Sequence, residues 1–143
     1  GSSLYSEALA FEVLDMCENA ELLKTEAEID YADSGGKKTD LLVMIEGAQV
    51  GVSVTRAYHY PPEDGMSIDD ASTLLEDKLS DVLLSAENAA GDDVWSRSLL
   101  QVIAWDAGHA DAVNSAYETL SAETQDQTLV FVTVTNGDDD ALY

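Results

Sequence analysis

Asp40 and Arg56 are the charged side chains whose positions in the sequence point to chemistry. They bracket two apolar runs, residues 41–45 and 50–54, and Gly47 lies in the short stretch that joins the runs. Runs of this length on either side of a turn residue predict the two strands of a β-hairpin. A carboxylate and a cation are therefore expected beside the most buried part of a sheet.

Glu7 and Glu12 are the candidate second carboxylates. Both border the apolar stripe of a helix predicted over residues 5–20, so each either extends towards a site or solvates the rim of the helix. Lys78 is the candidate ammonium group, because at 100° per residue it points into the apolar face of a later helix. We expect Lys78 to pair with a buried carboxylate, first Asp40 and next Glu7 or Glu12. Two acids and a lysine within about 4 to 6 Å would shift one another's pKa, which favours an enzyme.

A group of aromatic and titratable side chains follows the hairpin. Tyr58, His59 and Tyr60, near Arg56, form either an acid–base cluster for phosphodiester cleavage without a metal or a loop packed by its rings, and the second outcome is commoner. His59 and His109 have no second ligand at helical spacing, so no zinc site is expected. The sequence also contains no glycine-rich phosphate loop and no Gly-x-Ser-x-Gly elbow.

Helices and strands alternate along the chain. Apolar stripes of helical period predict helices over residues 5–20, 67–88 and 109–120. Alternating or continuous apolar runs predict strands over residues 27–32, 41–45, 50–55, 99–105 and 128–135. Ser67 is placed to cap the second helix, with Asp69 and Asp70 favourable in its first turn.

The strand over residues 50–55 is expected at the centre of the sheet. Its three valines alternate with Gly51, Ser53 and Thr55, and side chains this small indicate burial on both faces. Three strands joined by short turns predict an antiparallel meander, and the later helical crossovers predict parallel additions. The predicted fold is α/β, with a mixed five-stranded sheet and flanking helices in the order αβββαβαβ.

The length suits one domain with a sizeable core, which we place over residues 4–137. Residues 1–3, Gly-Ser-Ser, are expected to be a tag remnant, and residues 138–143 an acidic tail. Cys17 is the sole cysteine, which excludes an internal disulfide and a cysteine-rich zinc site. It is expected to pack as a small apolar residue.

Charge is the strongest compositional feature: 29 Asp and Glu against 6 Lys and Arg give a formal net charge of −23. Bare nucleic acid is an unlikely partner, because binding to phosphates needs a basic face. The sequence contains no signal peptide and no apolar run long enough for a bilayer, so we expect no membrane partner and a soluble, intracellular protein of the cytoplasm or nucleus. The acids either solvate the surface or imitate a polyphosphate. Their spread along the chain favours solvation.

The predicted architecture resembles the PD-(D/E)xK nuclease-like superfamily, which has the restriction-endonuclease-like fold. The resemblance rests on the element order, on an Asp that opens the second strand and on a third strand of small residues, and it covers nearly the whole chain. Enzymes of this superfamily place an Asp before the second strand, an acid-x-Lys triplet on the third and often a Glu on the first helix. With these groups they hold Mg²⁺ and activate water.

The resemblance implies roles for the candidate acids. Asp40 matches the acid before the second strand, although Thr39 stands where a proline is usual. Glu7 or Glu12 matches the acid of the first helix. If the site were active, Asp40 would be a Mg²⁺ ligand.

The acid-x-Lys triplet is missing from the third strand. Ser53 stands in the acid position and Thr55 in the lysine position. These residues would leave a metal with too little negative charge and the developing phosphorane without its cation. Further side chains expected to line the site are Arg56, Tyr58 and His59.

Three functions are consistent with these patterns. In the first, the fold is retained without its chemistry or cofactor, as a protein-interaction or scaffolding domain. In the second, a rebuilt Mg²⁺-dependent nuclease uses Asp40 with Glu7 or Glu12 to hold the metal and Lys78 to replace the missing lysine. In the third, the acidic chain imitates nucleic acid and inhibits a DNA-binding protein. The acidic surface and the two hydroxyl residues of the triplet favour the first.

Overall fold

The computed structural model describes residues 3–125 and 128–137. Its elements are α1 (Ser3–Glu18), β1 (Glu21–Thr25), β2 (Leu41–Ile45), β3 (Ala48–Ala57), α2 (Ile68–Asn88), β4 (Arg97–Ala104), α3 (Ala107–Thr119), the short α4 (Ala122–Gln125) and β5 (Thr128–Val134). The strands form one sheet in the order β1-β2-β3-β4-β5. The α/β class and the mixed five-stranded sheet predicted from the sequence are confirmed.

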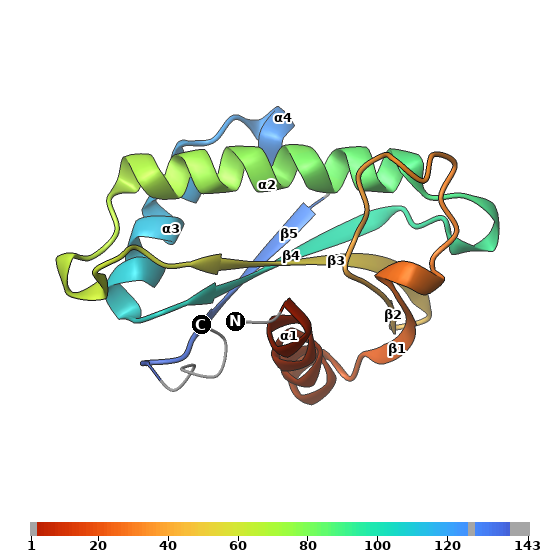
Figure 1. Cartoon of the computed structure of the whole chain (residues 1–143), viewed down its shortest axis with the longest axis horizontal. Helices are drawn as coiled ribbons and strands as arrows, with labels where there is room; N and C mark the ends of the chain where they lie inside the picture. The colour runs from red at the N-terminus through yellow and green to blue at the C-terminus, as the bar shows by residue number, and fades with distance from the viewer. Residues whose placement is uncertain (1–2, 126–127, 138–143) are drawn as a thin grey trace.

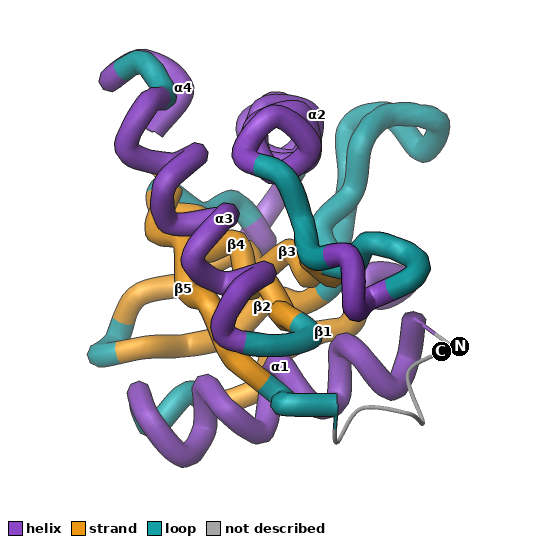
Figure 2. Tube along the Cα trace, turned by 90° about the vertical axis from the view of Figure 1, so that its left-hand side faces the viewer, coloured by secondary structure: helices purple, strands orange, loops and turns teal. Residues whose placement is uncertain are grey.

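The sheet is antiparallel on one side and parallel on the other. β1 pairs antiparallel with β2, and β2 antiparallel with β3. β3, β4 and β5 are parallel, because α2 and then α3 carry the chain back to the same end. Figure 1 shows α1 on one face of the sheet and α2 on the other, and Figure 2 shows α3 beside α2.

The β2–β3 hairpin has the tightest common connection. Ile45 pairs with Ala48, so the loop consists of Glu46 and Gly47 alone. Both residues have positive φ, 50° and 79°, as a type I′ turn requires. Such a turn fixes the register of β2 against β3, and it therefore determines which residues of β3 lie opposite Asp40.

The two faces of β3 contact different helices. Val52 is buried in the cluster that contains Leu14 of α1, whereas Ala57 is buried against α2 and α3. Because side chains alternate along a strand, the side chains of even number in β3 face α1 and those of odd number face α2. β3 is the third of five strands, which confirms that it is central.

The first strand was predicted wrongly at residues 27–32. The structure places β1 at Glu21–Thr25, and a 3-10 turn, Glu26–Glu28, follows it. Ile29 is buried against Leu42 and Trp95 beside the sheet, so the apolar alternation marks an anchored loop, not a strand. The edge strand escaped detection because it is short and starts with an exposed Glu.

Cys17 was also predicted wrongly, because it is exposed near the end of α1. The cap at Ser67 is confirmed: its hydroxyl accepts a hydrogen bond from the Asp70 N–H at 3.0 Å. Within the part of the chain that the structure describes, no helix combines the length and apolar character needed to cross a membrane. The predicted acidic tail at residues 138–143 lies outside the described residues.

Candidate functional site

Asp40 is fixed against β3 by two backbone contacts. Its carboxylate Oδ2 accepts a hydrogen bond of 2.7 Å from the Val54 N–H, and its own N–H donates to the Val52 carbonyl at 3.1 Å. The residue directly precedes β2, so the hairpin register determines both contacts. The carboxylate is half-buried and lies against the middle of β3, directly before the start of β2.

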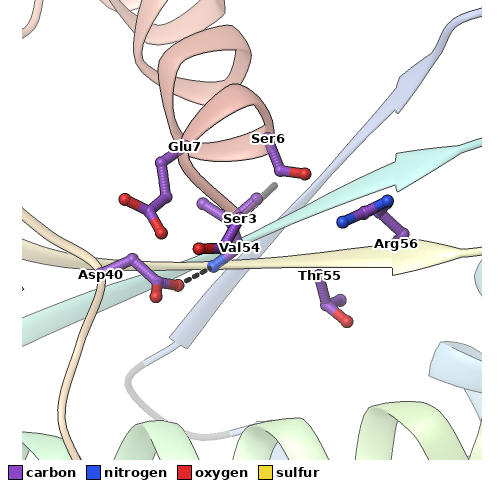
Figure 3. Close-up of a pocket in the computed structure, with 7 residues that line it drawn as sticks. All are labelled: Ser3, Ser6, Glu7, Asp40, Val54, Thr55 and Arg56. Atoms are coloured by element: carbon purple, nitrogen blue, oxygen red, sulfur yellow. Dashed lines mark hydrogen bonds between the residues drawn. The ribbon is translucent and has the colours of Figure 1, made fainter. Parts of the chain in front are cut away.

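A pocket of about 180 Å³ opens beside this carboxylate, between the start of α1 and the second half of β3 (Figure 3). It is lined by Ser3, Ser6, Glu7, Asp40, Val54, Thr55 and Arg56. The predicted site residues Glu7, Asp40 and Arg56 are therefore brought together from α1, the residue before β2, and β3. Thr55 also lines the pocket, although its side chain points towards α2.

The environment of Asp40 raises the pKa of its carboxyl group to about 6. Burial is the main cause, and the negative charges of Glu7 and Glu26 raise it further. The hydrogen bond from Val54 and the positive charge of Lys78 act in the opposite direction but do not outweigh burial. A carboxyl group with a raised pKa in a pocket is typical of functional sites.

Lys78 does not form the ion pair predicted for it. No carboxylate of the described residues lies within the 4.0 Å that defines a salt bridge to its ammonium group. Lys78 is half-buried on α2 and acts on Asp40 at longer range, as a charge that lowers the Asp40 pKa. The spacing of residues on the helix correctly predicted that Lys78 points towards the sheet. It could not predict how far α2 lies from the carboxylate of Asp40.

The side chains of β3 beside the pocket alternate between the two faces of the sheet. Figure 3 shows Thr55 pointing towards α2, while Arg56 points to the α1 side. Ser53 also faces α2, and its hydroxyl lies 3.2 Å from that of Thr39. Val54 and Arg56 therefore share a side with Glu7, whereas the side chains of Ser53 and Thr55 do not.

Three other predicted residues lie away from the pocket. Glu12 is exposed on α1 and does not line it. The Tyr58 ring packs edge-on against Trp105, with ring centroids 5.6 Å apart. The His59 Nδ1 lies 3.7 Å from a carboxylate oxygen of Asp70, at the amino end of α2. The predicted acid–base cluster of residues 58–60 does not converge on Asp40.

His109 was missed by sequence reasoning as a structural residue. It is fully buried, with Nδ1 2.6 Å from Oδ1 of Asp106, and it accepts a hydrogen bond of 3.3 Å on Nε2 from the His59 N–H. Asp106 also caps α3 by accepting from the His109 N–H. An Asp three residues before a His at a helix start was the available signal. Both ring nitrogens are engaged, so His109 links the loop after β3 to the start of α3.

The residues of the pocket fit a Mg²⁺ ion poorly. Glu7 and Asp40 are the two carboxylates that line it, and the side chain of Val54 offers no ligand atom. Among the described residues, no group of three or more His, Cys, Asp or Glu is placed to hold a metal ion. A bound ion would have to take most of its ligands from water or from a bound molecule.

Comparisons with known proteins give a sequence relative. No protein-family model matches the chain. It is 37% identical over 138 residues to the AAC-rich mRNA clone AAC4 protein of Dictyostelium discoideum, in an alignment that covers 92% of this chain and 20% of that protein. The chain thus spans about a fifth of the length of this relative.

A solved structure, Pyrococcus furiosus SfsA in complex with Ca²⁺, is similar at 13% identity and a TM-score of 0.41, over 92% of this chain and 55% of that one. A likeness this distant carries no weight for the site.

Proposed function

We propose that this chain is a non-catalytic, protein-binding domain built on a restriction-endonuclease-like fold. One observation carries the proposal: the side chains of β3 that share a side with Glu7 are Val54 and Arg56. In the nuclease-like superfamily these positions would need an acid and a lysine.

Valine and arginine at these two positions provide neither a metal ligand nor a group that can accept a proton. Valine has no oxygen to complete a metal site around Asp40 and Glu7. The guanidinium of Arg56 carries positive charge but does not deprotonate in proteins, so it cannot take up the proton of an attacking water. The remaining acids lie in a chain of net charge −23, which repels the phosphates of a nucleic acid substrate.

A protein partner suits the surface better than nucleic acid does. Large apolar side chains are exposed on both α1 and the edge strand β5, with Met16 79% and Leu129 60% exposed. Apolar side chains beside many carboxylates are suited to a partner that is itself apolar and basic.

The alternative function is a metal-dependent phosphodiesterase with a rebuilt site. It is favoured by one observation, that Glu7 and Asp40 line the same pocket while Lys78 acts electrostatically on Asp40. In that case Asp40 and Glu7 would hold the ion and Lys78 would stabilise developing negative charge.

Thermal unfolding in the presence of divalent ions distinguishes the two functions. A ligand that binds only the folded state must raise its melting temperature. For the non-catalytic domain we expect Mg²⁺ and Mn²⁺ to raise it no more than monovalent salt of equal ionic strength. Incubation with single- and double-stranded DNA and RNA should show no cleavage. A millimolar Mn²⁺ shift that disappears in Asp40→Ala and persists in Glu12→Gln, with cleavage above background, would overturn the proposal.

A further inference from the structure

We propose that the pocket between α1 and β3 binds a primary ammonium group with an adjacent carbonyl or carboxylate, as found in a free α-amino acid or at the amino terminus of a polypeptide. This inference rests on the non-catalytic function proposed above, because it assigns the pocket a ligand other than a metal ion. It is based on the distribution of hydrogen-bond acceptors and donors around the pocket.

One end of the pocket offers acceptors. Asp40 uses Oδ2 for the Val54 N–H, and no other hydrogen bond to this carboxylate is present among the described residues. Glu7 lies beside it, and neither carboxylate has a cation within salt-bridge distance in the described part of the chain. The two charges repel each other, as the effect of Glu7 on the Asp40 pKa indicates. An ammonium group has three N–H donors and would satisfy both carboxylates.

The other end offers donors. Ser6 lines the pocket, is only 5% exposed, and has a hydroxyl without any hydrogen-bond partner. Buried polar groups are nearly always paired, so an unpaired hydroxyl facing a pocket indicates a missing partner. Arg56 lines the same end, and Figure 3 shows the Ser6 hydroxyl directed to the Arg56 side. The Ser6 hydroxyl can donate to a carbonyl or carboxylate oxygen, and the positive charge of Arg56 nearby favours such an oxygen.

The two ends are separate but close. In Figure 3, Asp40 and Glu7 lie on one side, Arg56 lies on the other, and Ser6 is between them. The pocket volume of about 180 Å³ is smaller than the roughly 300–1,000 Å³ of clefts that take drug-sized ligands. A ligand that presents its cation and its oxygen within a few bonds therefore fits better than a long one.

Binding should depend on pH in a characteristic way. The charged groups that face Asp40 are Glu7 of α1, Glu26 of the turn after β1 and Lys78 of α2, with Arg56 of β3 across the pocket. A cation prefers the ionised carboxylate, so affinity should fall as the pH drops below about 6. For a polypeptide terminus it should fall again above about 8, where an α-amino group loses its proton.

The test is an NMR titration of the ¹⁵N-labelled chain with four small probes. L-alanine and L-alaninamide both carry the ammonium group next to a carbonyl or carboxylate. N-acetyl-L-alanine lacks the ammonium group, and ethylamine lacks the carbonyl. We expect saturable shifts around Glu7 and Val54 with alanine, alaninamide or both, and affinities at least about tenfold lower for the other two probes, or about 1.4 kcal/mol. Binding of alanine alone identifies a free amino acid, and binding of alaninamide identifies a polypeptide terminus.

Matched variants locate the site. Glu7→Gln and Ser6→Ala should each weaken binding, while Glu12→Gln, which removes an exposed carboxylate from the same helix, should leave it unchanged. Equal binding of ethylamine and alanine, equal loss in Glu7→Gln and Glu12→Gln, or no saturable binding at all would overturn the inference. A failure of this kind would not affect the expectation that Mg²⁺ and Mn²⁺ raise the melting temperature no more than monovalent salt does. A specific rise of the melting temperature with Mn²⁺ would overturn the proposed function instead.

Discussion

The N–H of Val54 donates a 2.7 Å hydrogen bond to the carboxylate of Asp40, so an acid that precedes one strand is fastened to the backbone of the next. This bond favours the ionised carboxylate, and yet the pKa of Asp40 is raised to about 6, because burial and two neighbouring glutamates outweigh it. The side chain is thus held in place by a contact that does not fully compensate its desolvation.

Asp40→Asn should make the fold less sensitive to pH. The folded-state pKa of Asp40 lies above the ordinary value of 3.8, so the folded protein holds this proton more tightly than the unfolded chain does. Stability from this group is present at pH 4 and is lost as the pH rises through about 6. Asparagine keeps an oxygen for the Val54 N–H but has no charge. In urea unfolding, the free energy of unfolding of Asp40→Asn relative to wild type should rise by roughly 2 to 3 kcal/mol between pH 4 and 7. If the difference between the two proteins stays the same at both pH values, the pKa of Asp40 is not raised.

Glu7→Gln and Lys78→Met should move the Asp40 pKa in opposite directions. Glu7 raises this pKa and Lys78 lowers it, so removing the first charge should lower it and removing the second should raise it. Titration of the Asp40 side-chain carbon by NMR measures both shifts, with Glu12→Gln as the control that should have no effect. Shifts of the same sign would show that one of the two charges does not act on Asp40 as described.

Val54→Glu combined with Arg56→Lys should create a metal response. The double change places an acid and a lysine on the side of β3 that faces Glu7, next to Asp40. We expect the variant to be less stable than wild type without metal, because it adds a third carboxylate to a confined pocket. Mn²⁺ should then raise its melting temperature, and it should not do so for Val54→Gln with Arg56→Lys. If the two variants respond alike, the register assigned to the triplet is wrong.

Gly51→Ala should destabilise the fold strongly. A Cβ at Gly51 would lie 2.3 Å from Cε2 of Trp95, which is closer than real contacts allow. Overpacking of this kind costs about 1–3 kcal/mol or more. Gly35→Ala is the matched control, since its Cβ would meet its nearest neighbour at an acceptable 3.4 Å. Urea unfolding should also show that adding Trp95→Leu to Gly51→Ala costs less than the sum of the two single changes.

Raising the salt concentration should stabilise the folded chain. At a net charge of −23, self-repulsion opposes the compact state. Screening weakens this repulsion as the Debye length falls from about 30 Å at 0.01 M to about 3 Å at 1 M. Melting temperatures should therefore rise with NaCl, and curves that do not move would show that the acids are balanced locally.

The fold was largely predictable because most elements are periodic in sequence. The hairpin and the parallel strands were placed within a few residues of their observed bounds, since alternating or continuous apolar runs determine them. β1 was missed because it is a short edge strand with only partial burial. Residues 27–32 imitated a strand because Ile29 and Tyr31 are anchored individually, the latter by a hydrogen bond from its hydroxyl to the Thr39 carbonyl.

Sequence patterns placed Asp40 and Glu7 near one another, but they did not indicate which face of β3 meets Glu7. Asp40, Glu7 and Arg56 were named from their positions relative to the elements, and the structure brings them to one pocket. The side of β3 that faces Glu7 depends on how α1 crosses the sheet, which no local pattern determines. The unpaired hydroxyl of Ser6 is likewise a property of packing, because an isolated helical serine carries no sign of burial.

The mixed pairing of the sheet has a consequence for how the chain folds. The β2–β3 hairpin closes through the two residues Glu46 and Gly47, so its loop-closure entropy is small and its contacts are local. The parallel ladder, from Val50 against Arg97 to Ala57 against Ala104, forms only after the whole of α2 has been brought back across the sheet. Contacts between residues so distant in the sequence slow folding. We therefore expect docking of β4 against the preformed hairpin to set the folding rate. Since the hairpin would already be formed in the transition state, φ-values near zero along both β2 and β3 would exclude this order of events.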